Sequence, residues 1–327
     1  MREIQFREAL REAMQEEMRR DESVFLMGEE VAEYNGAYKV SQGMLDEFGP
    51  KRVIDTPIAE LGFGGIGVGA AANGLRPIVE FMTFNFSLVA IDQVINSASK
   101  LMSMSGGQYS CPIVFRGPTG NAGQLSSQHS SNFENWYANT PGLKVVVPSN
   151  PADAKGLLKA SIRDNDPVIF MESELMYGDK GLVPDGEFLI PIGKAAVVQE
   201  GKDVTIVSFG KMISRVVVPA MLELEKMGIS VELIDLRSVR PIDYDTVLES
   251  VKKTNRCVVV EEANPLSAIS SEIAYHLQRW AFDYLDAPVV RVNSRDLPLP
   301  YAPTLIEEIL PNVARTIDAV KTVMYRK

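Results

Sequence analysis

The sequence predicts an α/β protein with two doubly wound domains. Short apolar runs rich in β-branched residues alternate with helical stretches, which is typical of a parallel sheet covered by helices on both faces. The alternation lapses from Ser173 to Asp203, where Gly, Pro and charged residues prevail, and then resumes. The chain, at 327 residues, also exceeds the size at which one core usually stops growing. We therefore expect a first domain over residues 1–180, a linker over 181–202 and a smaller domain over 203–327.

The first domain is expected to open with a helix, because apolar residues recur at four-residue spacing from Phe6 to Met18. A second helix is expected over residues 85–104. A third is expected over 150–165, because Asn150 is a good N-cap and Pro151 suits the first helical position. The strands of this domain are expected over residues 24–27, 52–54, 77–81, 112–116, 144–148 and 168–171.

The second domain repeats the pattern on a smaller scale. Its strands are expected over residues 204–209, 230–236, 257–261 and 289–292, and its helices over 213–227, 244–254 and 266–284. Because ligands of open parallel sheets bind where strands end and loops leave for the helices, we expect the chemistry at such loops.

Composition excludes several classes of function. The formal net charge is −10, which argues against nucleic acid as the main partner because such binding needs clustered Lys and Arg. The two cysteines, Cys111 and Cys257, stand far apart in strand-like runs and are expected to be buried, not to form a disulfide or a metal site. No apolar run approaches the roughly 20 residues of a membrane span, and the first residues resemble neither a signal nor a transit peptide. We expect a cytoplasmic protein that does not bind membranes.

Glu60 is the most informative carboxylate of the chain. It stands among apolar residues just before a segment rich in Gly and Ala. Burial there removes hydration and favours the neutral carboxyl, which suits a residue that exchanges protons with a cofactor. The alternative is a carboxylate that only caps the following helix.

The glycines after Glu60 also match the G-x-G-x-x-G spacing of dinucleotide sites, with Gly62, Gly64 and Gly67, and Glu80 at the distance of a ribose-binding acid. In that fingerprint, however, the first glycine ends the strand, whereas here the stretch Thr56–Leu61 intervenes. We expect these glycines to lie within a helix, where they permit close packing.

A long polar segment after Arg116 carries His129 within Ser-Ser-Gln-His-Ser-Ser. Long polar loops are often functional, and His129 can serve as a proton donor in a cleft, the alternative being a plain surface histidine. No G-x-S-x-G motif is present, so these serines do not indicate a hydrolase. His276 lies in an amphipathic stretch and is interpreted as structural. Asp164 and Asp166 follow a helix end, where they either help to bind a hard cation or simply stop the helix before Pro167.

Taken in order, several stretches resemble the β subunits of pyruvate dehydrogenase E1 components, which are thiamine diphosphate enzymes of the transketolase-like group. The resemblance spans nearly the whole chain, and this set of motifs in this order is specific. It lies in residues 28–40, 52–63, 74–87, 90–98, 127–130 and 236–243.

The resemblance implies roles for individual residues. Glu60 matches the glutamate that hydrogen-bonds N1′ of the aminopyrimidine, a contact that favours the imino tautomer able to remove the thiazolium C2 proton. Phe86 matches an aromatic residue beside the pyrimidine, with Ile58 and Met82 as walls of its site. His129 matches a histidine that moves a proton as the acetyl group passes to a lipoyl arm. A potassium site is implied at Ile113, Ser161, Ile162, Asp164 and Asp166, mostly through backbone oxygens.

The same resemblance implies a partner. These enzymes hold the diphosphate through Mg²⁺ on a Gly-Asp-Gly motif, and the nearest string here, Gly178-Asp179-Lys180-Gly181, does not fit. An α subunit is therefore expected to bind the diphosphate and Mg²⁺, in an α₂β₂ assembly that uses pyruvate and acetylates lipoyl groups of the E2 dihydrolipoyl acetyltransferase. Two alternatives are a branched-chain 2-oxoacid dehydrogenase β subunit and a scaffold without catalytic function.

Overall fold

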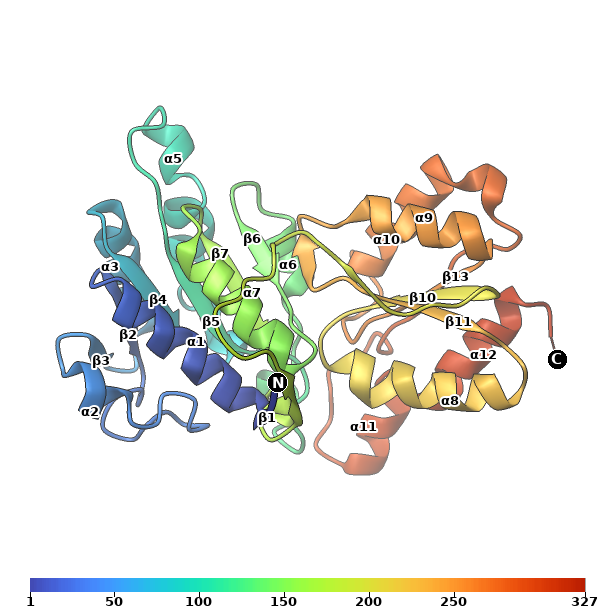
Figure 1. The fold of residues 1–327 in the computed structure, drawn as a ribbon, viewed down its shortest axis with the longest axis horizontal. Coiled ribbons are helices and arrows are strands. Elements are labelled where there is room, and N and C mark those ends of the chain that lie inside the picture. Colours follow the sequence, from blue (N-terminus) through green and yellow to red (C-terminus); the bar gives the residue numbers. More distant parts are fainter. Residues whose placement is uncertain (327) are drawn as a thin grey trace.

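Two sheets organise the chain, and helices cover both faces of each (Figure 1). The computed structural model describes residues 1–326. The predicted fold class, two α/β domains, is confirmed. The two units are joined by one continuous apolar core, in which Val145 and Val147 of the first unit belong to the same cluster as Val207 and Leu236 of the second.

The first sheet has seven strands in the order β12-β6-β7-β5-β4-β2-β3, and all six predicted strands are among them. Six of the strands, from β6 to β3 in this order, are parallel, whereas β12 pairs with β6 in the antiparallel sense. Because β12 comes from the later half of the chain, it ties that half to the first sheet. The strands are β2 (Val24–Gly28), β3 (Val53–Asp55), β4 (Arg76–Glu80), β5 (Val114–Pro118), β6 (Lys144–Val146), β7 (Val168–Glu172) and β12 (Ser238–Arg240).

The second sheet has five strands in the order β14-β13-β10-β11-β9. The four predicted strands are parallel. The fifth strand, β9, forms one edge of the sheet and is antiparallel to its neighbour β11. It lies within the segment predicted as linker. They are β9 (Ala196–Gln199), β10 (Val204–Ser208), β11 (Val231–Asp235), β13 (Cys257–Val260) and β14 (Val290–Val292). A separate antiparallel pair joins β1 (Arg2–Gln5) to β8 (Lys180–Val183).

The helices of the first unit place the site. The first helix, α1 (Phe6–Arg20), lies against α7 (Pro151–Arg163) in front of the sheet (Figure 1), and α3 (Glu60–Ala72) starts after β3. The single helix predicted over residues 85–104 is wrong. It is divided into α4 (Phe84–Ser87), a π-helical segment (Gln93–Ala98) and α5 (Leu101–Met104), and the Ser99 hydroxyl donates to the Ile95 carbonyl, a contact that bends helices. The remaining short helices are α2 (Met44–Phe48) and α6 (Glu134–Ala138).

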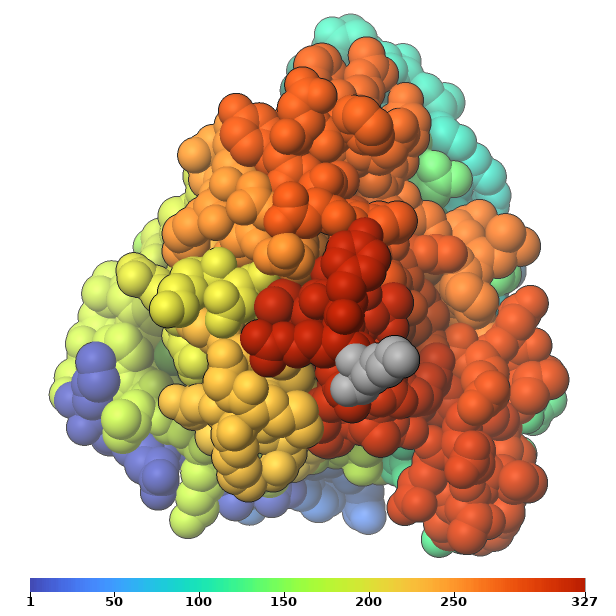
Figure 2. All heavy atoms as spheres, turned by 90° about the vertical axis from the view of Figure 1, so that its right-hand side faces the viewer, coloured from blue at the N-terminus to red at the C-terminus, as the bar shows by residue number. Residues whose placement is uncertain are grey.

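The helices of the second unit divide between the faces of its sheet. On one face lie α8 (Val218–Lys226) and α12 (Val313–Val323), and on the other α9 (Tyr244–Thr254) and α10 (Ile269–Trp280) (Figure 1). In Figure 2, which faces this unit, α12 lies near the centre and α11 (Pro303–Ile309) at the lower right. The helix predicted over 266–284 is shorter, because a 3₁₀ turn (Phe282–Tyr284) follows α10. Residues 213–217 of the predicted 213–227 helix are π-helical.

Cys111 and Cys257 are both free and buried. Within residues 1–326, no helix combines the length and apolar character needed to cross a membrane.

Candidate active site

Four neighbouring strands of the first sheet, β3, β2, β4 and β5, deliver polar and aromatic side chains to one edge. Glu60 follows β3, Glu29 follows β2, Phe86 follows β4 and His129 follows β5. All four strands are parallel, so their carboxyl ends lie side by side at one end of the sheet, here called its ligand-binding edge. That edge is where ligands of open parallel sheets bind.

Glu60 is the first residue of α3 and is buried, with 6% of its surface exposed, although Ile58, Ala59 and Leu61 around it are exposed. The N-cap residue is Ala59, which makes no side-chain capping bond. The Glu60 side chain therefore turns inward from an exposed loop and is not the N-cap.

The glycines that follow Glu60 lie within α3, as predicted, and bring that helix close to the sheet. A Cβ on Gly67 would lie 2.7 Å from Val79 Cγ2, and one on Gly64 would lie 3.3 Å from Ala90 Cβ. These glycines do not form a strand-to-helix turn, and Glu80 is buried in an ion pair with Arg116. The dinucleotide interpretation is therefore wrong.

Glu29 is a site residue that the sequence analysis missed. Its side chain is 5% exposed and faces Glu60. Burial, and secondly the charge and hydrogen bonding of Glu60, raises the pKa of Glu29 to about 7. Among residues 1–326, no donor reaches its buried Oε1 atom. The signal in the sequence was Gly28-Glu29-Glu30 directly after an apolar strand.

Loop-to-loop hydrogen bonds hold the two glutamates together. The Asp55 carboxylate accepts from the backbone N–H of Ala32 at 2.7 Å and of Glu33 at 3.0 Å. The Thr56 N–H donates to the Gly28 carbonyl at 2.9 Å. The loop that carries Glu29 is thereby fastened to the loop that leads into Glu60.

Phe86 and His129 meet edge to face, with ring centroids 5.1 Å apart and an interplanar angle of 90°. Thr83 caps α4 and thereby places Phe86, while the Asn85 Oδ1 atom accepts from the Ser131 N–H at 3.1 Å. The structure thus brings two of the predicted site residues into direct contact. Burial raises the pKa of the nearby Glu174, an effect offset in part by Tyr38, Lys211 and His129.

The two residues predicted to wall the pyrimidine site differ in their exposure to solvent. Met82 is half-buried beside the edge, whereas Ile58 projects from the surface with 84% exposed. Within this chain Ile58 is not packed, so it can wall a site only where a second chain closes over this surface.

Three of the five predicted potassium ligands, Ile162, Asp164 and Asp166, are bonded to cationic side chains of the protein. The carbonyls of Ile162 and Asp164 accept from Arg76 Nη1 at 3.0 and 2.9 Å, and the Ile113 carbonyl accepts from the Val168 N–H. The Asp164 carboxylate pairs with Lys144, as does Asp166, and the Ser161 hydroxyl donates to the Leu157 carbonyl. A potassium ion would have to share the Ile162 and Asp164 carbonyls with Arg76 and the two carboxylates with Lys144, and its presence stays a prediction.

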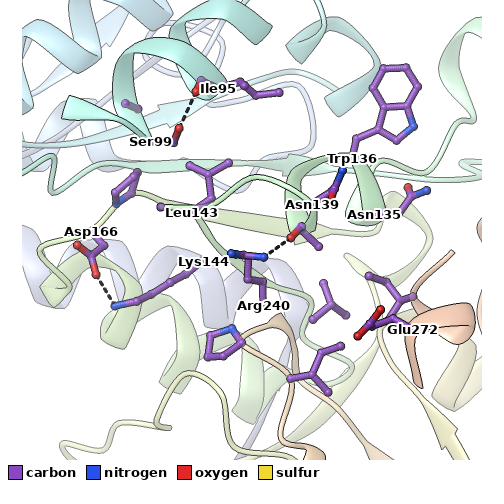
Figure 3. A pocket seen from close by; sticks show the side chains of 18 of the residues that line it. Ile95, Ser99, Asn135, Trp136, Asn139, Leu143, Lys144, Asp166, Arg240 and Glu272 are labelled. Carbon is purple, nitrogen blue, oxygen red and sulfur yellow. Dashed lines mark hydrogen bonds and ion pairs between the residues drawn. The ribbon is translucent and has the colours of Figure 1, made fainter. Parts of the chain in front are cut away.

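A groove of about 1800 Å³ is a different feature (Figure 3). It runs between the two units, and Trp136, Lys144, Arg240 and Glu272 are among its lining residues. Glu60, Phe86 and His129 are not among them. Nearby, His276 stacks on Tyr244 at 3.8 Å, and burial lowers its pKa, which agrees with a structural role.

Comparison with known proteins identifies the family. Residues 2–180 match the family described as transketolase, pyrimidine binding domain, and residues 193–316 match transketolase, C-terminal domain. The pyruvate dehydrogenase E1 component subunit beta of Rhizobium meliloti is 59% identical over 98% of this chain and 70% of that protein. The chain belongs to the pyruvate dehydrogenase E1 beta-subunit family.

Other relatives in the E1 beta family cover this chain as fully. The Rickettsia felis subunit beta is 54% identical over 99% of both chains, and the mitochondrial subunit of Pisum sativum is 52% identical over 99% of this chain and 91% of its own. A solved structure titled split gene transketolase, inactive beta4 tetramer, superposes with a TM-score of 0.79, 22% identity and 99% coverage of both chains. That likeness shows the fold.

Proposed function

We propose that this chain is the β subunit of a pyruvate dehydrogenase E1 component. With an α subunit it decarboxylates pyruvate oxidatively and acetylates lipoyl groups on E2, the dihydrolipoyl acetyltransferase, on the way to acetyl-CoA. The observation that carries the proposal is the buried Glu60 facing a second acid, Glu29, at the ligand-binding edge of the sheet.

The residues at this edge fit the pyrimidine half of thiamine diphosphate. Glu60 offers a buried carboxyl to a ring nitrogen, Glu29 Oε1 lacks a donor within the described chain, and Phe86 offers an aromatic ring beside His129. When bound, thiamine diphosphate supplies the nucleophilic carbon and the electron sink for decarboxylation. The protein contributes orientation and proton transfer.

Within this chain, Glu60 holds a proton at its carboxyl for the pyrimidine N1′ atom. Glu29 acts on Glu60, because two facing buried carboxyls share a proton more readily than both ionise. His129, positioned by its edge contact with Phe86, moves a proton when the acetyl group passes to the lipoyl arm.

The surface near Glu60 supports an α partner. The helix α3 is apolar on its outer side as well as its inner side, with Leu61 50% and Ile66 64% exposed, and Ile58 and Val89 are exposed nearby. A helix that is apolar all round is normally buried. The α subunit would cover this surface and bring the diphosphate site and Mg²⁺, in an α₂β₂ assembly. The isolated chain should therefore bind thiamine diphosphate with Mg²⁺ weakly in calorimetry, and tight binding would contradict the shared site.

A cytoplasmic location agrees with two free, buried cysteines, which suit a reducing compartment. A potassium ion at Asp164 and its neighbours is retained as a proposal without a step in the reaction.

The test is reconstitution with an α subunit and assay of two substrates, pyruvate and 3-methyl-2-oxobutanoate. We expect pyruvate to be preferred, and preference for the branched substrate would favour the branched-chain alternative. Glu60→Gln should lower the rate by about a hundredfold or more, because proton transfer to the cofactor is lost. Glu30→Gln is the matched control, since Glu30 is exposed and close in sequence to Glu29. Parental activity in Glu60→Gln would favour the scaffold.

A further inference from the structure

The second unit holds the loop that carries His129. Residues 119–133 leave the end of β5 in the first unit, yet their closest polar anchors include Lys211 and Glu262, which follow β10 and β13 of the second sheet. Because β10 and β13 are adjacent parallel strands, these two side chains emerge at the same edge. The ligand-binding edge of the second sheet thus faces the loop of the first.

Lys211 and Glu262 form hydrogen bonds with both backbone groups of Asn121. The Glu262 Oε1 atom accepts from the Asn121 N–H at 2.6 Å, and Lys211 Nζ donates to the Asn121 carbonyl at 2.6 Å. Lys211 Nζ also pairs with Glu262 Oε2 at 2.7 Å. Both side chains are more than nine-tenths buried, so water does not screen the pair.

The contact is too close for any side chain at the neighbouring position. Gly120 has a φ of +73°, and a Cβ there would lie 2.9 Å from Glu262 Oε1. Glycine is the residue that adopts this backbone region without strain. The loop base is therefore shaped to receive the carboxylate of the second unit.

The hydrogen bonds at Asn121 are connected to His129 through a backbone hydrogen bond that closes the base of the loop. The Gly120 N–H donates to the Ser131 carbonyl at 3.0 Å, and Ser131 lies two positions after His129. On the other side of the loop, the Ser127 hydroxyl donates to the Leu299 carbonyl of the second unit at 2.7 Å. Gln124 and Leu125, between these anchors, are exposed. Within the first unit, the loop is also held by the Ser131–Asn85 hydrogen bond and the contact between His129 and Phe86.

We propose that Lys211 and Glu262 are positioning residues for His129, which makes the second unit part of the acetyl-transfer machinery. The inference rests on the proposed function. Neither side chain needs to touch substrate, because the pair acts by fixing the loop base. A displacement of a proton donor by about 1 Å can reduce a rate by a hundredfold.

The test uses Lys211→Met in the reconstituted α₂β₂ enzyme, with Lys253→Met as the matched control. Lys253 also pairs with a buried glutamate of the second unit, Glu232, but is not bonded to the loop. Hydrogen exchange of residues 119–133 should speed up in Lys211→Met and not in Lys253→Met. Because Lys211→Met leaves a buried carboxylate unpaired, the double variant Lys211→Met/Glu262→Gln provides a neutral counterpart that should fold and show the same faster exchange.

Two partial reactions then separate positioning from general damage. Acetyl transfer to a lipoyl domain should lose about tenfold or more in kcat with an unchanged KM, while decarboxylation measured with an artificial electron acceptor stays within about twofold. Adding Lys211→Met to His129→Ala should cause no further loss. Unchanged exchange in the loop, or an equal fall in both reactions, would overturn the inference. Hydrogen exchange of the loop can be measured without substrate. A parent enzyme that is inactive on pyruvate would therefore reject the proposed function and leave the exchange test of this inference intact.

Discussion

Glu29 and Glu60 face each other with both carboxyl groups buried, at the ends of the adjacent strands β2 and β3. Two such groups cannot both be charged without cost, and burial together with the charge of Glu60 raises the pKa of Glu29 to about 7. A carboxyl whose pKa lies near neutral can gain or lose a proton there, which suits a group that assists proton exchange with a ring nitrogen. The pair thus links the fold of two loops to the proposed chemistry.

The pair makes stability depend on pH, and Glu29→Gln should reduce that dependence. The folded-state pKa of Glu29 is raised to about 7. Its contribution to stability is therefore complete below the pKa of the unfolded chain and is lost as the pH rises through about 7. The parent Tm should fall more steeply than that of the variant between about pH 5 and pH 8. Three other acids with pKa raised to about 7, Glu134, Asp235 and Glu261, remain in both proteins. A constant Tm difference across this range would refute the shared proton.

Two glycines of α3 offer a sharp comparison of packing. Gly67→Ala should destabilise the chain by about 1–3 kcal/mol, because the new methyl would meet Val79 at 2.7 Å. Gly69→Ala should instead stabilise it by up to about 1 kcal/mol, since nothing lies within 4 Å of that position. Urea unfolding measures both. Equal effects would mean that α3 does not rest on the sheet as described.

Much of the fold could be predicted from local patterns. The apolar runs of β2 to β7 are continuous because both faces of a parallel sheet are covered, and each is visible without its neighbours. The pairing of β12 with β6 joins Ser238 to Val146, and no local pattern reports such a distant contact. The amphipathic helix α12 was visible in principle but was not predicted.

The site residues also divide into those that local sequence could predict and those that depend on distant contacts. Glu60 could be predicted because its own neighbours in sequence create its apolar setting. Glu29 has a local signal, its place directly after an apolar strand, but its burial could not be predicted because Asp55 fastens its loop from more than twenty positions away. The role of Lys211 at the His129 loop depends on two sheets meeting, a fact of tertiary structure.

A buried cluster of one arginine and two glutamates in the first sheet should be sensitive to loss of its arginine. Arg116 is fully buried between Glu80 and Glu172, and Tyr177 donates to Glu172 at 2.7 Å. Arg116→Met would leave two carboxylates without a counter-charge, and we expect a loss of about 3–5 kcal/mol in unfolding free energy. Arg215→Met is the control, because the Arg215–Asp179 pair is partly exposed, and it should cost no more than about 1 kcal/mol. Similar losses in urea titrations would show that burial does not set the difference.

The exposed apolar side of α3 predicts how the α subunit is held. Ile66→Asp should weaken α₂β₂ assembly by at least about tenfold in Kd, because association would bury a carboxylate in an apolar contact. Leu222→Asp is the matched control, since Leu222 is 57% exposed on α8 of the second unit. Sedimentation of mixed subunits gives the affinities, and the Tm of each variant alone checks that the fold is retained. Equal weakening by both variants would place the α contact elsewhere, and Glu60 would then lack the second chain that the shared cofactor site requires.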